Sequence, residues 1–258
     1  DGTLKGAKAI ADAANNREAP IGIVGIPKTI DNDLGFVEKT FGFETSVQIA
    51  SEIISCAHNE AEGAENGIGI VKLMGRDSGF IAATASLANS VVDFCLIPEL
   101  PFHVHGPDGL CAAVHNSLKL HRHAVIVVAE GAGQDLFKNT KQRIDQSGNI
   151  LKDDIGEYLK SELSNYFKKD GTAISIKYLD PSYHIRSVVA NASDAVFCNL
   201  LAEYAVHAGM AGKTNLAIGY WNNFFTHVPI ALATKERRMV SLNGALWRGV
   251  LSATQQEK

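Results

Sequence analysis

The sequence predicts an α/β protein in which mostly parallel sheets are flanked by helices. Apolar runs of strand length alternate with longer segments of helical periodicity, which is the order expected of βαβ units. The run from Ala124 to Ala129 is almost wholly apolar, as a strand at the centre of a parallel sheet should be. Hydrophobic residues make up 46% and charged residues 20% of the chain, so we expect an ordinary globular protein.

The first half of the chain carries clear boundaries between these elements. Pro27 closes a short apolar run, Gly63 follows a helical segment, and Pro107 suits the first turn of a helix. We therefore expect strands at residues 21–26, 67–74, 91–97 and 124–129, and helices at residues 3–16, 45–62, 79–89 and 107–121.

The second half continues the alternation after a polar stretch at 132–150. We expect this stretch to be a loop and the best internal boundary. Asn191 or Ser193 can cap a long apolar helix. We expect strands at residues 173–178 and 216–221, and helices at residues 153–168, 191–208 and 243–254.

The bulk composition excludes two classes of partner. The net charge is -4 and no basic stripe is present, so the sequence does not indicate nucleic-acid binding. No stretch reaches the ~18 apolar residues of a membrane span. The four cysteines show no CxxC spacing, and we expect them to be reduced thiols of a cytoplasmic protein.

The first candidate site follows the strand expected at 21–26. Thr29, Asp31 and Asp33 are spaced two apart, so in an extended chain they point to one side, with Lys28 on the other. Ligands of open α/β sheets bind at the carboxyl ends of the strands. A carboxylate there can serve as a base. A polar turn that caps the next helix would account for the same residues.

Three further candidate sites follow later strands. Met74, Gly75 and Arg76 lead from a strand into a helix, where backbone N–H groups and a guanidinium favour an anion, although a tight turn uses the same residues. Glu130 follows the central strand and can accept a sugar hydroxyl, unless it is a solvated loop carboxylate. The remaining candidates, which a plain surface loop would also explain, are Lys177, Tyr183 and Arg186.

Because these four signals all fall at strand ends, we expect a single cleft lined by acidic and cationic groups. Carboxylates beside cationic donors suit phosphoryl transfer to a hydroxyl. The pairs His103/His105 and His121/His123 lack acidic or cysteine companions at useful spacing, and we expect surface histidines rather than a metal site.

At these residues the sequence resembles the phosphofructokinase family. The matching motifs are Pro27-Lys-Thr-Ile-Asp-Asn-Asp33, Met74-Gly-Arg76 and Ala129-Glu-Gly131. Asp180-Pro-Ser-Tyr-x-Ile-Arg186 is similar to a motif of the plant-like and trypanosome-like ATP-dependent branch. The resemblance covers essentially the whole chain and implies two Rossmann-like lobes, of which the first is incomplete.

The resemblance also implies roles for these residues. Asp31 is the general base for the C1 hydroxyl of fructose 6-phosphate, and Thr29 and Asp33 help to order the transferred phosphoryl group. Arg76 stabilises charge in the transition state. The sugar-phosphate contacts are Met74, Gly75, Glu130, Tyr183 and Arg186. Lys177 matches a position where the family often has an arginine that reaches in from a neighbouring subunit, which implies a dimer or tetramer.

Asp1-Gly2-Thr3 resembles the tail of a Gly-Gly-Asp-Gly-Thr motif. By this resemblance Asp1 helps to hold Mg²⁺, and Gly2, Thr3 and Lys28 lie at the phosphoryl donor. Gly2 leaves room for a nucleotide, whereas Lys28 also occurs in enzymes that use pyrophosphate; together they favour ATP. The family's first strand and glycine-rich phosphate loop would precede Asp1, so we expect the chain alone to be nearly inactive.

The sequence thus predicts a 6-phosphofructokinase of glycolysis, which transfers phosphate from ATP to fructose 6-phosphate and gives fructose 1,6-bisphosphate. We expect residues 1–131 to be the remainder of a catalytic lobe and residues 132–258 to be a sugar-phosphate-binding lobe, with an approximate boundary that the C-terminus can cross. Three alternatives stay open: a pyrophosphate-dependent enzyme, a non-catalytic sugar-phosphate-binding subunit, and an unrelated metal-binding α/β domain.

Overall fold

A computed structural model describes residues 2–19, 21–137, 143–144, 150–254 and 256. It has the α/β fold that the sequence predicts, with parallel strands covered by helices. Within this part of the chain, no helix combines the length and the apolar character needed to cross a membrane.

The chain divides into two compact units. Unit 1 contains Asp1–Ser46 and Arg186–Arg238, and unit 2 contains Val47–Ile185 and Met239–Lys258. The sequence-based boundary at 131/132 does not coincide with this division, because it lies inside unit 2. The strands before and after the 132–150 stretch pair with the same central strand, so both sides of it belong to one sheet.

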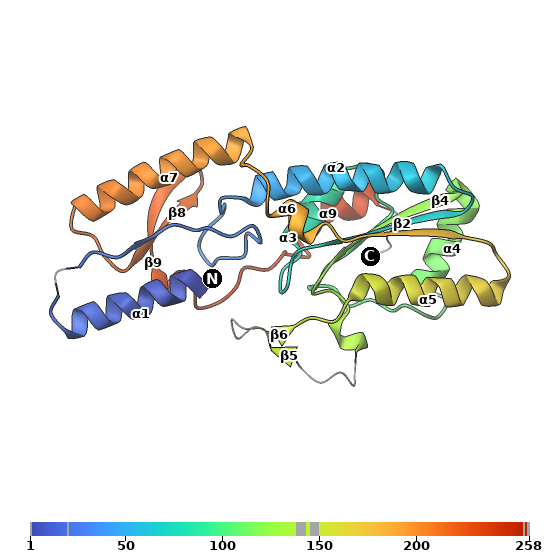
Figure 1. The fold of residues 1–258 in the computed structure, drawn as a ribbon, viewed down its shortest axis with the longest axis horizontal. Coiled ribbons are helices and arrows are strands. Elements are labelled where there is room, and N and C mark those ends of the chain that lie inside the picture. Colours follow the sequence, from blue (N-terminus) through green and yellow to red (C-terminus); the bar gives the residue numbers. More distant parts are fainter. Residues whose placement is uncertain (1, 20, 138–142, 145–149, 255, 257–258) are drawn as a thin grey trace. The chain divides into compact units, whose positions relative to one another are not determined.

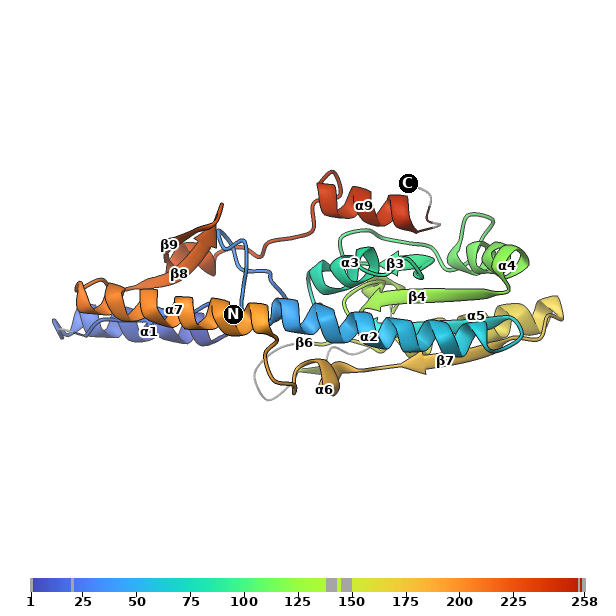
Figure 2. The ribbon, with the colours of Figure 1, turned by 90° about the horizontal axis from the view of Figure 1, so that it is seen from above.

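Unit 2 is built on a four-stranded, all-parallel sheet in the order β3-β4-β2-β7. Figure 2 shows β3, β4 and β7 successively across this sheet, with α2 in front of it. The strands are β2 (Gly67–Leu73), β3 (Phe94–Leu96), β4 (His123–Ala129) and β7 (Ser175–Leu179). β4 is buried along almost its whole length, as its apolar sequence predicts.

Helices cover both faces of this sheet, and Figure 1 shows α2 and α5 on opposite sides of it. The helices of unit 2 are α2 (Phe43–Glu62, which begins in unit 1), α3 (Phe80–Leu87), α4 (Leu110–His121), α5 (Ile155–Asp170), α6 (Ser182–Ile185) and α9 (Ala245–Ala253). A short 3-10 helix, η1 (Gln134–Leu136), and a small antiparallel pair, β5 (Arg143–Ile144) and β6 (Ile150–Leu151), follow β4.

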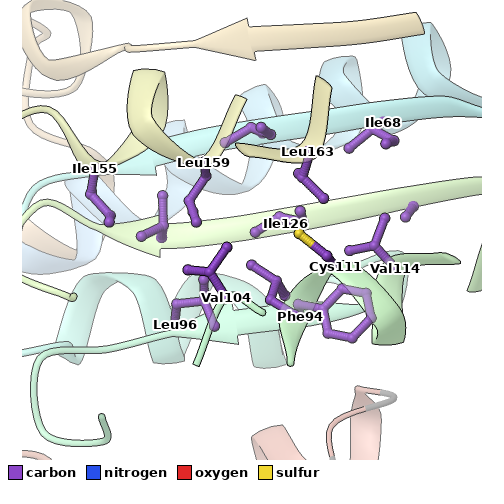
Figure 3. Packing of buried hydrophobic residues seen from close by; sticks show 14 of the residues in the cluster. Ile68, Phe94, Leu96, Val104, Cys111, Val114, Ile126, Ile155, Leu159 and Leu163 are labelled. Atoms are coloured by element: carbon purple, nitrogen blue, oxygen red, sulfur yellow. The ribbon is translucent and has the colours of Figure 1, made fainter. Parts of the chain in front are cut away.

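The main hydrophobic core lies between the sheet and the helices α4 and α5. Alternate residues of the strands, such as Ile68 and Ile126, meet Val114 of α4 and Leu159 and Leu163 of α5 (Figure 3). All five side chains are completely buried.

On the other face, α2 approaches β2 closely because β2 has glycine there. A Cβ atom at Gly67 would lie only 2.0 Å from the carbonyl oxygen of Ala61. The glycine therefore sets how near the helix can come to the strand.

Unit 1 is a smaller sheet in the order β1-β8-β9. Its elements are α1 (Gly2–Asn16), β1 (Val24–Gly25), α7 (Ala192–Met210), β8 (Leu216–Trp221), β9 (Phe224–Pro229) and α8 (Ile230–Ala233). β1 is parallel to β8, and β8 and β9 form an antiparallel hairpin. Figure 1 shows α7 and α1 on opposite sides of these strands.

Four sequence-based expectations about these elements need correction. The strand expected at 21–26 pairs with β8 only at Val24–Gly25, so it is much shorter. β9, α6 and α8 were not expected. The helix expected from Pro107 begins at Leu110, because Pro107 lies in a turn before it. Part of 132–150 forms strands instead of a loop, and its residues 138–142 and 145–149 lie outside the described structure.

Candidate functional site

Three of the four predicted signals follow strands that end at the same edge of the unit 2 sheet. Arg76 follows β2, Glu130 follows β4, and Tyr183 lies on α6 after β7. The three strands are parallel neighbours, so their carboxyl ends lie side by side. The fourth signal, at Lys28–Asp33, follows β1 of the other sheet. Three of the four signals therefore belong to the sheet of unit 2 and one belongs to the sheet of unit 1.

The turns after β2 and β4 are hydrogen-bonded to each other. The N–H of Glu130 donates to the carbonyl of Leu73 at 2.9 Å, and the N–H of Gly131 donates to the carbonyl of Gly75 at 3.1 Å. The Met74-Gly-Arg76 and Ala129-Glu-Gly131 motifs, each a weak signal alone, thus form one local structure.

Steric constraints explain why glycine occupies one position in each of these two turns. Gly75 has a φ of +134°, which side chains rarely adopt, and a Cβ there would lie 2.5 Å from the carbonyl oxygen of Ser78. A Cβ at Gly131 would lie 2.0 Å from the carbonyl oxygen of Arg76. Substitution of either residue forces a backbone to move.

The charged side chains of these turns form an ion pair. Nε of Arg76 lies 3.2 Å from Oε1 of Glu130, and both side chains are partly buried. The guanidinium is planar and carries five N–H donors in a fixed arrangement, so the carboxylate that contacts Nε fixes the direction of the whole group. Glu130 can therefore orient the Arg76 guanidinium as a donor to a phosphoryl group.

The sequence suggested that the start of α3 offers free N–H groups to a substrate anion. The N–H of Gly79, the residue before the helix, is not free for this. The N–H of Gly79 donates to both carboxylate oxygens of Glu99, at 3.0 and 3.1 Å. Glu99 also accepts the N–H of Val240 at 2.8 Å. The protein's own carboxylate thus occupies this position, and its role there is structural.

A second charge cluster at the same sheet edge was missed by the sequence analysis. Nζ of Lys72, on β2, lies 2.9 Å from a carboxylate oxygen of Asp154 and 2.8 Å from one of Asp180. The hydroxyl of Tyr178 donates to Asp154 at 2.8 Å. The only signal in the sequence was a lysine near the end of an otherwise apolar strand.

The cluster shifts the ionisation of its members. Partial burial acts to lower the pKa of Lys72, but hydrogen bonds with Asp180 and Asp154 outweigh it and raise the pKa above its usual value. Partial burial acts to raise the pKa values of Asp154 and Asp180, and the hydrogen bonds from Lys72 and neighbouring groups leave both below the usual value. All three groups are therefore charged at neutral pH.

Tyr183 lies beyond the carboxyl end of β7, whereas Lys177 lies in the middle of that strand. Tyr183 is 80% exposed on α6, beyond the strand end. Lys177 aligns with Gly69, four residues before the end of β2, which corresponds to about 13 Å along a strand. Its Nζ lies 3.9 Å from a carboxylate oxygen of Glu60 on α2. Within unit 2 the structure does not bring Lys177 to the edge that carries Arg76.

In unit 1, the segment that carries Asp31 is bent rather than extended. Asn32 has a φ of +54°, and its buried side chain accepts hydrogen bonds from the N–H and the hydroxyl of Thr40 at 3.0 and 3.2 Å. The N–H of Asp31 donates to the hydroxyl oxygen of Thr29 at 3.2 Å. The expectation that Thr29, Asp31 and Asp33 share one side of an extended chain is therefore wrong. Asn tolerates this left-handed backbone better than most residues do.

Two arginines that the sequence analysis missed hold this segment. Nη1 of Arg237 lies 2.8 Å from a carboxylate oxygen of Asp33, whose side chain is only 4% exposed. Arg238 donates to the carbonyl of Asn32 at 2.9 Å, and its N–H donates to the carbonyl of Asp33 at 2.8 Å. Burial lowers the pKa of the Arg238 side chain. More than 200 residues separate these partners along the chain, so no local pattern could predict them.

The other predicted residues are placed as follows. Arg186 is an exposed residue of unit 1, Lys28 is exposed, and Gly2 and Thr3 form the first turn of α1. Asp1, the predicted magnesium ligand, lies outside the described residues. His103, His105 and His121 are exposed, as expected of surface histidines, whereas His123 is half-buried at the start of β4. Within the described ranges, no group of three or more His, Cys, Asp or Glu side chains could hold a metal ion.

Comparison with known proteins identifies the family. A family model described as "Phosphofructokinase" matches residues 1–209 of the chain. The chain belongs to the phosphofructokinase family. A protein of Borreliella burgdorferi named "ATP-dependent 6-phosphofructokinase" is 50% identical over 99% of this chain and 59% of its own length. "ATP-dependent 6-phosphofructokinase 7" of Arabidopsis thaliana is 47% identical over 99% of this chain and 53% of its own length.

The chain therefore spans between half and three fifths of these phosphofructokinase relatives. Solved structures agree on the fold. A pyrophosphate-dependent phosphofructokinase from Marinobacter aquaeolei superposes with a TM-score of 0.73 at 20% identity, over 99% of this chain and 66% of that one. Phosphofructokinase from Pichia pastoris gives 0.69 at 23% identity, over 99% of this chain and 27% of that one. At this level of identity the structural likeness bears on the fold alone.

Proposed function

We propose that the full-length protein is an ATP-dependent 6-phosphofructokinase. The observation that carries the proposal is the 50% identity, along 99% of the chain, to a protein of that name. The reaction transfers the γ-phosphoryl group of ATP to the C1 hydroxyl of fructose 6-phosphate. It gives fructose 1,6-bisphosphate and ADP, as in glycolysis.

In this proposal Asp31 is the general base. As the C1 oxygen bonds to the γ-phosphorus, the bond from that phosphorus to the bridging β–γ oxygen breaks, and the proton of the C1 hydroxyl passes to the Asp31 carboxylate. Asp31 belongs to a segment whose backbone is fixed by Asn32 and by the arginines that hold its neighbour Asp33. A fixed backbone supports this role because a base must stay within hydrogen-bond reach of the proton it removes.

Thr29 and Asp33 then have different tasks beside the base. The Thr29 oxygen accepts the N–H of Asp31, which leaves its own O–H as a donor for a phosphoryl oxygen. Asp33 is nearly buried against Arg237, which suits a positioning role better than direct contact with the substrate. Both tasks agree with the ordering function that the family resemblance implied.

The cationic groups stabilise the transferring phosphoryl group and the sugar phosphate. We assign charge stabilisation in the transition state to Arg76, which Glu130 orients at 3.2 Å. Met74, Gly75, Glu130, Tyr183 and Arg186 are the proposed sugar-phosphate contacts. The side chain of Tyr183 is 80% exposed, which agrees with a place at the surface of the site.

ATP is the proposed donor, with Gly2, Thr3 and Lys28 beside its phosphates. Mg²⁺ supplies charge neutralisation of the phosphates when it is bound. Magnesium is commonly held by one or two carboxylates together with substrate phosphates, so a cluster of three protein ligands is not required. Asp1 is the proposed protein ligand.

We further propose a cytoplasmic homo-oligomer, a dimer or a tetramer. Lys177 is half-exposed on the edge strand β7, in a position that suits contact with the substrate of a neighbouring subunit. All four cysteines are free thiols, which is typical of a reducing compartment.

The proposal is tested by assaying the full-length protein with fructose 6-phosphate and either ATP or pyrophosphate, with phosphorus NMR as the readout. We expect fructose 1,6-bisphosphate with ATP and Mg²⁺, and little with pyrophosphate. The reverse preference would move the protein to the pyrophosphate-dependent group. Binding of fructose 6-phosphate without product from either donor would instead indicate a non-catalytic subunit.

A further inference from the structure

The Lys72 cluster links three elements at the edge of the sheet. Its lysine comes from β2, Asp154 is the N-cap residue of α5, and Asp180 follows β7. The lysine side chain is only 12% exposed, so the energetic cost of removing its charge from water must be offset by its partners. With two carboxylates within 2.9 Å, Lys72 is the charge that keeps both of them in place.

The two carboxylates depend on Lys72 to different degrees. Asp154 also accepts hydrogen bonds from the N–H groups of Gly156 and Glu157, at 3.0 and 3.2 Å, and from the Tyr178 hydroxyl. These bonds anchor Asp154 at the start of a 16-residue helix. Among the described residues, the other hydrogen bonds to the Asp180 side chain come from Ser182, two residues later in its own segment. Lys72 is therefore the main link between the Asp180 side chain and the rest of the sheet.

The segment that Asp180 fixes is the one that carries Tyr183. One oxygen of Asp180 meets Lys72, and the other accepts the N–H of Ser182 at 3.2 Å as well as its hydroxyl. These bonds set the direction of the first turn of α6, from which the exposed Tyr183 projects. At the other end of α6, Ile185 is buried and provides the second anchor.

We propose that Lys72 is a positioning residue for sugar binding, which acts through Asp180 on the segment that carries Tyr183. The inference rests on the proposed function. Lys72 itself does not contact substrate in this account. Without it, two carboxylates would remain close together with no cation between them, and the more weakly anchored Asp180 would move.

The test uses the full-length enzyme and three substitutions. Lys72→Met removes the charge and keeps the length, Lys72→Arg keeps the charge, and Asp180→Asn weakens the same link from the other side. Lys160→Met is the control, because Lys160 is a partly exposed lysine on α5 that pairs with Glu157 away from Lys72 and Asp180. The readouts are kcat, the KM values for both substrates, and the calorimetric Kd for fructose 6-phosphate.

We expect Lys72→Met and Asp180→Asn each to raise KM and Kd for fructose 6-phosphate by about three- to tenfold, the equivalent of one lost hydrogen bond. The values of kcat and of KM for ATP should stay within about twofold, since the interaction lost is one of sugar binding. Lys72→Arg should recover most of the affinity. The Lys72→Met/Asp180→Asn double variant should be no worse than the worse single one, because both remove one interaction.

A merely structural role gives a different result: a lower melting temperature with unchanged KM and Kd for the sugar phosphate. That result in Asp180→Asn and Lys72→Met would overturn the proposal. If Lys72→Met does not fold, an unchanged Kd in Asp180→Asn alone overturns it. If the wild-type protein binds fructose 6-phosphate but does not phosphorylate it, the proposed function fails, while the Kd comparison still decides the role of Lys72.

Discussion

A methyl group at Gly131 should disrupt the junction that holds Arg76. The added Cβ would lie 2.0 Å from the carbonyl oxygen of Arg76 and 3.0 Å from that of Gly75. Both obstacles are backbone atoms, which cannot rotate away as a flexible side chain can. In Gly131→Ala one of the two turns must therefore move, and the hydrogen bond from the Gly131 N–H to Gly75 must lengthen.

The size of the effect follows from these contacts. Overpacking of a tight site costs about 1–3 kcal/mol, and a weakened buried hydrogen bond adds about 0.5–1.5 kcal/mol. We expect the free energy of unfolding to fall by about 2–4 kcal/mol on this basis. The turn that moves carries either Arg76 or its partner Glu130. A displacement of ~1 Å at such a group can lower kcat about 100-fold.

The measurement is urea denaturation together with kcat of the full-length enzyme. Gly209→Ala is the matched control, since Gly209 lies in α7 and its Cβ would meet no heavy atom within 4 Å. We expect that control to be neutral or more stable by up to ~1 kcal/mol, because alanine favours a helix over glycine. If Gly131→Ala is as stable and as active as the wild type, the close approach described here does not exist.

Three further predictions test other parts of the account. Asn32→Ala leaves the buried N–H of Thr40 without its acceptor, and we expect the free energy of unfolding to fall by about 1–3 kcal/mol in urea titrations; no loss would contradict the described loop. Glu99→Gln keeps the size of the side chain but removes its charge at the start of α3, and we expect the free energy of unfolding to fall by about 1 kcal/mol. The KM values should not change, because the role of Glu99 is structural. The carboxylates beside Lys72 have pKa values lowered in the folded state, so their stabilisation is present above about pH 4 and is lost as the pH falls through the folded values. Between pH 5 and pH 2 the wild type should therefore lose more stability than Lys72→Met, and equal losses would argue against that coupling.

The features that the sequence predicted well are those with a local cause. The apolar runs of β2 and β4 and the helical periods of α2, α5 and α7 are properties of neighbouring residues, and the structure confirms these elements. The positions of Arg76 and Glu130 just after two strands were predicted in the same way. That these strands are adjacent and parallel, and that the two turns bond to each other, is a tertiary fact that the sequence only suggested.

Most features that the sequence did not predict depend on residues far apart in the chain, and one had a local signal that was overlooked. β1 is short because only two of its residues find partners on β8. Arg237 holds Asp33 from 204 residues away, which no window of sequence can reveal. The hairpin of β8 and β9 did have a local signal. Its turn is Asn222-Asn223, both with positive φ, and asparagine is among the residues preferred in such two-residue turns.

The most direct test of the account is the turnover of Asp31→Asn in the full-length enzyme. The amide keeps the size of the side chain but cannot accept the proton of the C1 hydroxyl at neutral pH, so kcat should fall by about 10²–10⁴-fold. The Kd for fructose 6-phosphate should change little, since the fold of the 27–35 segment rests on other groups. Turnover at the wild-type rate in this variant would contradict the assignment of Asp31 as the base.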